Sequence, residues 1–314
     1  MNSGNCSAVS EFLIFGFHSL QRFRLPLFVI LSLIYIVTFL ENLLIVVLVT
    51  ISANLQIPMY FILKCISLCE LLYVTNLVPK ILHDILSEQP TISVTACIIQ
   101  LHMFGTTGNT MSFLYALMSY DRYVAIANPL RYTSLINKTQ CLYMVLGFCV
   151  ISFTLACVIA GFLYKLEFCH QNIINHIYCD FSPVVNLSTS DTSLLQMITS
   201  LFSLVIMLFP LVFTILAYVF IMQAIVRMPS AIGRKKAFST CSSHLFVVII
   251  HIGILFSVYV IPTKENNNNK GVSFIYIIVT PLINPIIYTL RNKEIHTSFA
   301  KSLRKLNIAN NISF

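Results

Sequence analysis

An aspartate and an arginine stand side by side at the end of a long apolar run, in the string MSYDRYVAIANPLRY that spans residues 118–132. The carboxylate of Asp121 can hold the guanidinium of Arg122 in one rotamer through charge-assisted hydrogen bonds. When a partner protein offers a better acceptor, the guanidinium is released, and the pair works as a switch. The alternative is a structural pair of charges at a helix end, where long basic side chains reach towards water. For an isolated pair the structural interpretation is the more common one, so these two residues alone leave both open.

The composition is that of a membrane protein. The chain has 314 residues, of which 57% are hydrophobic and 10% charged, and its mean hydropathy is +0.86. A helix needs about 20 apolar residues to cross the hydrocarbon of a bilayer. Seven stretches reach that length: 25–51, 58–78, 96–125, 141–164, 194–226, 237–261 and 272–290. We therefore expect an all-α membrane protein built as a bundle of seven transmembrane helices.

The distribution of charge predicts the orientation of these helices. Basic residues gather after the odd-numbered stretches, whereas most acidic residues outside the apolar runs lie at their other ends. Because basic segments stay in the cytoplasm, the N-terminus is expected outside the cell. Residues 1–24 are then an extracellular tail, 25–290 the seven-transmembrane domain, and 291–314 a cytoplasmic amphipathic helix and tail. The net charge of +8, placed this way, indicates a membrane surface and no nucleic-acid partner.

Two features of the tails follow from this orientation. Asn5 begins the sequon Asn5-Cys6-Ser7 on the outer tail, so we expect it to carry a glycan. After the last stretch, apolar residues recur at positions 295, 299, 303 and 306 among basic ones. That spacing predicts an amphipathic helix lying on membrane lipid.

Several strings together resemble one family. MSYDRYVAIANPLRY resembles the Asp-Arg-Tyr signature of rhodopsin-like receptors in the extended form MAYDRYVAICNPLRY of the odorant receptors, with Ser119 and Ala127 as departures. KAFSTCSSHL, from Lys236, is similar to the family string KAFSTCxSHL, and PLINPIIYTLRNKE, from Pro281, is similar to PMLNPLIYSLRNKE. The resemblance runs from the second stretch to the tail. It implies an odorant (olfactory) receptor of the rhodopsin-like, class A, G protein-coupled receptors.

The resemblance implies a function and a location. Binding of a small hydrophobic odorant would favour a rearranged bundle that receives a heterotrimeric G protein of the stimulatory olfactory type and raises cyclic AMP. The protein would lie in the plasma membrane, in the cilia of olfactory sensory neurons. The switch and coupling residues carried over by this resemblance are Asp121, Arg122, Tyr123, Tyr218, Lys236, His244, Asn284, Pro285 and Tyr288. Among them, Pro285 removes a backbone donor and makes the last helix deformable, and Tyr218 would close behind Arg122 in the active state.

The ligand pocket is also placed by analogy with the family, in the outer half of the bundle. The residues expected there are Phe104, Gly105, Gly108, Asn109, Ser112, Phe181, Phe202, Ile206, Ile252, Tyr259 and Ile277. They are largely apolar, so without the resemblance they would be assigned to packing between helices. With no fixed charge among them, they favour small neutral hydrophobic ligands. Where the family commonly has Phe-Tyr-Gly, this chain has His251-Ile252-Gly253; His251 could replace the missing Tyr or be a core histidine.

Cysteine usage predicts one disulfide and leaves one residue open. Cys97 at the outer end of the third stretch and Cys179 in the second outer loop would meet in an oxidising compartment. The family resemblance strengthens that pairing. Odorant receptors usually add a bridge from the position of Cys169 to a Cys in an LSCSDT string, but here that string is LSTSDT, from Leu187. We expect Cys169 to be free, with a bond to Cys6 as the alternative.

Acidic residues inside the apolar stretches cost about 3 kcal/mol each at a span centre and need internal partners. Glu70 stands where the family has Asp, Glu41-Asn42 where Gly-Asn is usual, and Met111 where the third span often carries an acid. We infer a relocated cluster of Glu41, Asn42 and Glu70 with Asn284, which would bind a sodium ion or a proton. The alternative is a protonated Glu41 that is merely hydrogen-bonded. We expect no other cofactor and no metal centre.

Two rival functions are compatible with seven spans. One is a rhodopsin-like receptor for a ligand that is not an odorant. The other is a channel or transporter that uses Glu41 and Glu70 as an ion path. No motif of a metalloprotease, serine hydrolase or nucleotide-binding enzyme appears, so we expect no enzyme.

Overall fold

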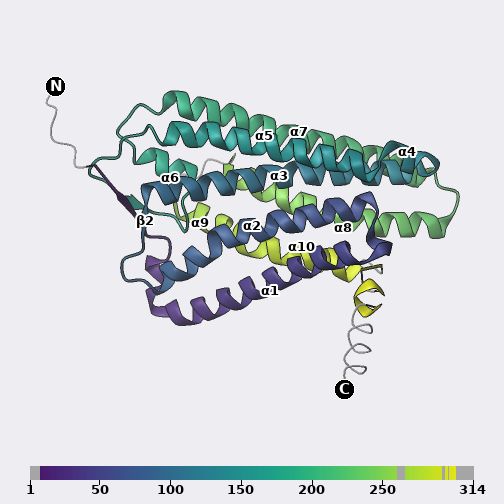
Figure 1. The fold of residues 1–314 in the computed structure, drawn as a ribbon, viewed down its shortest axis with the longest axis horizontal. Coiled ribbons are helices and arrows are strands. Elements are labelled where there is room, and N and C mark those ends of the chain that lie inside the picture. The colour runs from purple at the N-terminus through teal and green to yellow at the C-terminus, as the bar shows by residue number, and fades with distance from the viewer. Residues whose placement is uncertain (1–7, 260–265, 292–293, 296, 302–314) are drawn as a thin grey trace, which may run out of the picture.

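The long helices of the computed structural model, which describes residues 8–259, 266–291, 294–295 and 297–301, lie side by side along one axis (Figure 1). They are α1 (Arg24–Ile51), α2 (Pro58–Leu86), α3 (Val94–Ala127), α5 (Lys138–Leu163), α7 (Ser193–Val226) and α8 (Ala231–Tyr259). After α8, one more long helix completes the bundle. It is a composite of α9 (Asn266–Phe274), the π-helical turn η4 (Ile275–Val279) and α10 (Thr280–Arg291). Each predicted stretch falls on one of these helices.

Length and composition alone mark five stretches of the described chain as able to cross a membrane: Leu20–Ile51, Pro58–Leu86, Lys138–Leu163, Ser193–Val226 and Lys270–Tyr288. The helices α3 and α8 are as long but carry more polar side chains, including the Asp121–Arg122 pair on α3. Helix ends extend beyond the predicted stretches because polar residues can continue a helix into water. Thus α8 begins at Ala231, in a basic segment, six residues before the predicted start.

Local sequence sets the ends of two of these helices. Ser93 caps α3 by accepting a hydrogen bond from the backbone N of Ala96 (3.2 Å). Asn137 and Gln140 form a capping box at the start of α5, in which each side chain accepts from the other's backbone N–H. Short helical turns connect the long elements: η1 (His18–Phe23), η2 (Ala53–Leu55), η3 (Pro129–Arg131), α4 (Tyr132–Leu135) and α6 (Phe181–Asn186).

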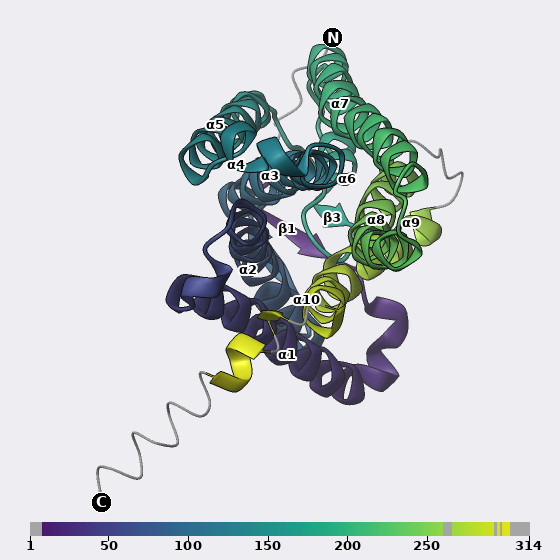
Figure 2. The ribbon, with the colours of Figure 1, turned by 90° about the vertical axis from the view of Figure 1, so that its right-hand side faces the viewer.

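Helix α3 is the centre of the bundle. It packs against α2, α5, α7 and α8, as the view along the bundle shows (Figure 2). Large apolar side chains on the outer helices point away from the bundle; Leu25 is 63% exposed and Val205 is 64% exposed. That pattern is expected of a protein whose outer surface faces lipid. The core therefore lies along α3, and this one helix runs from one end of the bundle to the other.

One end of the bundle is closed by a three-stranded sheet, and we call this end the sheet end. The strands β1 (Glu11–Ile14), β2 (Thr91–Ser93) and β3 (Ile173–Ile174) have the order β2-β1-β3, with β1 antiparallel to β2 and parallel to β3. After β1, Gly16 passes so close to the next segment that an added Cβ would lie 2.6 Å from the Cα of Ile177. The N-terminal segment is thus packed tightly onto the second loop.

At the opposite end, which we call the Arg122 end, the chain continues past α10 as a short helix. Residues 294–295 and 297–301 are helical, and Ile295 is buried against the bundle whereas Phe299 is 38% exposed. The predicted helix after the last span is therefore present in the part that the structure describes. The other two apolar positions expected on its lipid face, 303 and 306, lie outside the described residues.

Candidate functional site

The adjacent charges of α3 form a tight ion pair at the Arg122 end. The Nε and Nη2 atoms of Arg122 donate to Oδ2 of Asp121 at 3.0 and 2.5 Å. The other carboxylate oxygen, Oδ1, accepts from the hydroxyl of Tyr132 on α4 at 2.7 Å. Burial, and then the charge of Asp121 and the hydrogen bond to it, raise the pKa of Tyr132, so its hydroxyl stays protonated and donates. Both oxygens of the fully buried Asp121 are therefore occupied.

Aromatic and polar side chains from three other helices surround this pair. Tyr218 on α7 is buried beside Ile221 and Cys241, with Tyr123 packed against them. The Tyr218 hydroxyl donates to the backbone O of Cys241 at 3.4 Å, so in this structure it bridges α7 and α8. The ring of the buried His244 on α8 lies 3.2 Å, through Nδ1, from Sδ of Met118.

The same region reaches α10 as well. The His244 ring centroid is 6.0 Å from that of Tyr288, which is also buried. Asp121, Arg122, Tyr123, Tyr218, His244 and Tyr288 are thus gathered at the Arg122 end. Of the remaining expected switch residues, Pro285 lies inside α10, and the side chain of Lys236 lies outside the described residues.

A buried polar cluster lies further along the bundle. The amide of Asn284 on α10 donates to Oε1 of Glu70 on α2 at 2.5 Å and to the hydroxyl of Tyr115 on α3 at 3.0 Å. Asn42 on α1 joins α10 by donating to the backbone O of Pro281 at 3.5 Å. Oxygens of Glu70, Asn284 and Asn42 are buried with no hydrogen-bond partner among the described residues. The cluster therefore joins four helices and keeps free acceptor atoms.

Glu41 does not join this cluster in the structure. No hydrogen bond between Glu41 and Glu70 is present among the described residues, and Glu41 is only partly buried. The reason is geometric, because neighbouring residues on a helix point about 100° apart, and Asn42 takes the inward direction. The inferred set thus divides: Asn42, Glu70 and Asn284 lie in the core, whereas Glu41 faces another way.

A cavity opens between α3, α5, α7, η4 and the second loop, towards the sheet end. It holds about 810 Å³ of empty space, its open mouth included. Eight of the eleven expected pocket residues line it: Phe104, Gly105, Gly108, Asn109, Ser112, Phe181, Phe202 and Ile206. Ile277 is buried but does not line the cavity; its neighbour Tyr276 does. The side chains of Ile252 and Tyr259 lie outside the described residues.

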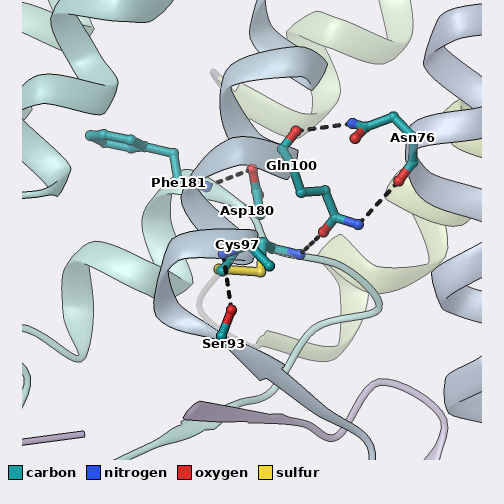
Figure 3. The surroundings of a disulfide bond; sticks show 8 residues. Asn76, Ser93, Cys97, Gln100, Asp180 and Phe181 are labelled. Carbon is teal, nitrogen blue, oxygen red and sulfur yellow. Dashed lines mark hydrogen bonds between the residues drawn. A yellow bond between two sulfur atoms is a disulfide. The ribbon is translucent and has the colours of Figure 1, made fainter. Parts of the chain in front are cut away.

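A disulfide holds the second loop over this cavity. Cys97 and Cys179 are bonded, as predicted, and Figure 3 shows the bond at the start of α3. Oε1 of Gln100 accepts from the backbone N of Cys179 at 3.1 Å, and Gln100 also exchanges hydrogen bonds with the backbone O and side chain of Asn76 on α2 (Figure 3). The loop residue after the bond, Asp180, is thereby fixed at the cavity wall.

The geometry agrees with what comparison with known proteins finds. A model of the olfactory receptor family matches residues 31–305. Human olfactory receptor 6N1 is 38% identical over 98% of this chain and 99% of its own length. Mouse olfactory receptor 5M5 is 40% identical over 97% and 96%, and human olfactory receptor 5A2 is 41% identical over 96% and 94%.

The chain belongs to the olfactory receptor family. The predicted fold is thereby confirmed: it is a seven-transmembrane bundle with a short helix after the last span. This olfactory receptor carries its cavity near the sheet end and its ion pair at the Arg122 end, and the single helix α3 connects them.

The sequence prediction missed several residues of the cavity wall. They are Leu101, Ile159, Asp180, Thr199, Ser203, Met207 and Tyr276. A signal for two of them was available on the same helix: Thr199 lies three residues before the expected Phe202, and Ser203 lies three residues before the expected Ile206. Asp180 follows the disulfide cysteine directly. Its Oδ1 accepts from the backbone N of Phe181 (2.9 Å), and burial raises the pKa of its carboxyl.

The expectation that Cys169 is free is wrong. Cys169 is disulfide-bonded and 8% exposed, and its partner lies outside the described residues, as does Cys6, the alternative partner. The prediction gave more weight to the family's usual partner position, which this receptor lacks, than to the alternative partner. In the structure the backbone of Cys169 pairs with that of Ala8, so the N-terminal segment runs beside it. Asn5 also lies outside the described residues.

Proposed function

We propose that this olfactory receptor binds small, mainly hydrophobic odorants in the cavity and activates a heterotrimeric G protein of the stimulatory olfactory type. The observation that supports this is the position of α3. Its sheet-end half contributes Phe104, Gly108 and Ser112 to the cavity, and its other end carries the Asp121–Arg122 pair. A ligand that shifts α3 relative to its neighbours therefore changes the surroundings of Arg122. The protein acts as a receptor and not as an enzyme.

The chemistry of the cavity defines the class of ligand. Its wall is mostly aliphatic and aromatic, with Asn109, Ser112, Thr199 and Ser203 as neutral hydrogen-bonding groups. The hydroxyl of Thr199 is buried with no hydrogen-bond partner in the described chain. The wall also contains the acid Asp180, whose Oδ1 accepts from the backbone N of Phe181 and whose pKa is raised by burial. We therefore expect uncharged, mainly hydrophobic ligands with one or two polar atoms. About ten heavy atoms at roughly 0.5 kcal/mol each give about 5 kcal/mol, which is a dissociation constant of about 0.1 to 1 mM.

The orientation that fits this function places the sheet end outside the cell. Residues 1–24 then form the extracellular tail with Asn5 glycosylated, 25–290 the receptor domain, and 291–314 the cytoplasmic helix and tail. The basic residues of the Arg122 end, such as Arg131 and Lys138, support this orientation. We place the receptor in the plasma membrane of olfactory cilia. An epitope inserted before Glu11 should be stained on intact cells; staining only after permeabilisation would reverse the orientation.

The buried polar cluster is a candidate site for a proton or a sodium ion. The free oxygens of Glu70 and Asn284 are acceptors, and a proton or a small cation would satisfy them. Glu70→Gln should remove any dependence of signalling on sodium concentration, because it deletes the ionisable group. Glu41→Gly should leave that dependence unchanged, since Glu41 stands apart in the structure. The opposite pattern would return the site to Glu41.

The function is tested by a cyclic AMP reporter in cells that display the receptor, screened with a diverse panel of volatile compounds. Arg122→Ala should abolish the response to any active compound at equal surface density. Arg131→Ala is the matched control, because Arg131 is an exposed arginine at the same end. Equal responses from the wild type and Arg122→Ala would remove Arg122 from the mechanism. A ligand-gated current in cells without G proteins would favour a channel.

A further inference from the structure

A histidine on α8 is bonded to the floor of the cavity. His251 is 1% exposed, and its Nε2 lies 3.1 Å from Oγ of Ser112 on α3. The same Oγ lies 3.2 Å from the backbone O of Gly108, to which it donates. A serine hydroxyl has one proton to donate but can also accept, so the consistent arrangement has Nε2–H of His251 donating to Ser112. The pair is a direct polar link between α3 and α8.

The link continues from the cavity into the polar cluster. Ser112 and Tyr276 line the cavity, and the His251 ring lies 5.9 Å from the ring of Tyr276. On its other side the His251 ring lies 4.7 Å from the ring of Tyr115, one turn along α3. The Tyr115 hydroxyl in turn accepts from Asn284. His251 therefore lies between the cavity wall at Ser112 and Tyr276 and the polar cluster in which Asn284 is bonded to Glu70.

His251 itself is not part of the cavity lining. Besides Ser112, the His251 ring lies against the aromatic rings of Tyr115 and Tyr276, and packing against those rings does not require a ring nitrogen. Burying an imidazole is costly unless its polar atoms find partners, and Ser112 supplies one. A ligand can disturb this hydrogen bond, because Ser112 lines the cavity and a polar ligand atom beside it competes for the Ser112 hydroxyl.

We propose that His251 is a positioning residue that transmits occupancy of the cavity to the rest of the bundle, through its hydrogen bond to Ser112 and its ring contact with Tyr115. This inference rests on the proposed receptor function. The bond between α3 and α8 is present together with the Asp121–Arg122 pair. A ligand atom that takes the Ser112 hydroxyl releases His251, and α8 then separates from α3. The state in which Arg122 is free of Asp121 gains population accordingly.

The experiment compares four variants at matched surface density. Ser112→Ala and His251→Phe each remove the hydrogen bond between the two side chains. The double variant removes the same single bond, whereas His251→Gln keeps a side-chain N–H donor. Ser119→Ala is the matched control: Ser119 is 1% exposed on the same helix, and its hydroxyl donates only to the backbone O of Tyr115. Ligand-independent cyclic AMP is measured for each. Separately, amide hydrogen exchange is measured in the half of α8 nearer the Arg122 end, on purified receptor in nanodiscs without G protein.

Ser112→Ala and His251→Phe should each raise basal cyclic AMP by roughly 3- to 10-fold, the range expected for one net hydrogen bond. The double variant should do no more than either single one, because both delete the same interaction. His251→Gln should stay near the wild type, and exchange in α8 should rise in parallel with the signal.

Additive effects, a response to Ser119→Ala of equal size, or identical behaviour of His251→Gln and His251→Phe would overturn the proposal. If His251→Phe fails to reach the surface, the comparison of Ser112→Ala with Ser119→Ala still decides. If no variant and no odorant changes cyclic AMP, the signalling function fails. The exchange rates then decide the coupling by themselves: unchanged protection of α8 refutes it.

Discussion

The hydroxyl of Tyr132 offers the cleanest single-atom test of the ion pair. Tyr132→Phe removes the donor that lies 2.7 Å from Oδ1 of Asp121 and leaves the two hydrogen bonds from Arg122 in place. Asp121 is fully buried, so its carboxylate loses a donor that water can replace only in part. We expect the carboxylate to hold Arg122 less firmly, and ligand-independent signalling to rise.

The size of the effect follows from the geometry. A hydrogen bond to a charged group contributes about 1.5 to 3 kcal/mol when it is fully buried. Tyr132 is partly exposed, so water replaces part of the bond, and about 1 kcal/mol is a reasonable net loss. We take the Tyr132 bond to belong to the held state, in which it is observed. With RT of about 0.59 kcal/mol, its loss then raises the ratio of released to held Arg122 about fivefold. A receptor with about 1% of the released state would then have about 5%.

The assay is basal cyclic AMP in cells without added ligand, normalised to surface density by staining an outer epitope. Tyr143→Phe is the control, because Tyr143 lies on α5 with 70% of its side chain exposed and loses a hydroxyl in the same way. A basal signal that stays at the wild-type level, or falls below it, would show that Tyr132 does not stabilise the held state. A rise of equal size in the control would assign the effect to expression.

Three further predictions concern stability. Cys97→Ser should destabilise the receptor by about 3 kcal/mol. The helix α5 stays in the membrane when the protein unfolds, so the disulfide restrains only the roughly 16 residues between the end of α5 and Cys179. An unchanged melting temperature in detergent would contradict this. Gly16→Ala should cost about 1 to 3 kcal/mol by forcing apart backbones that an added Cβ would approach to 2.6 Å. A protease should cut the N-terminal segment faster in Gly16→Ala than in the control Gly147→Ala, because an added Cβ at Gly147 has no atom within 4 Å. Equal cleavage rates would refute the close approach. Asn284→Ala should cost about 1 to 3 kcal/mol, because the buried carboxyl group of Glu70 loses its donor; thermal unfolding as in the wild type would show that another group takes over.

Hydropathy was sufficient to place the long helices, because a span of about 20 apolar residues has few alternatives in a membrane. The ends were less predictable. The prediction stopped the second span at residue 78, just before Pro79, whereas α2 passes through Pro79 and ends at Leu86. A proline inside a membrane helix is tolerated when neighbouring helices satisfy the freed carbonyl. The sheet was not predicted at all, since β2 and β3 are only three and two residues long.

The switch residues were placed through short strings that resemble the family, and eight residues of the cavity wall were placed by analogy with it. Contacts between helices were not accessible in that way. The sequence showed two intramembrane acids, Glu41 and Glu70, but only the structure shows that Asn284 reaches one of them. The sequence did not decide whether His251 is a core residue or a functional one, because its partner Ser112 lies 139 positions away and on another helix. Asp180 directly follows Cys179 in the sequence, yet its place at the cavity wall depends on the disulfide beside it.

The sheet has a consequence for biosynthesis. The strand β1 is among the first residues made, but β2 follows a whole helical hairpin later and β3 is complete only at Ile174. At roughly 5 to 20 residues per second, β1 waits about 10 to 30 s for its second neighbour. During that interval its backbone donors and acceptors are an open edge, available to any extended peptide nearby. Quality control of the nascent chain must therefore shield a four-residue segment long before the rest of the molecule can cover it.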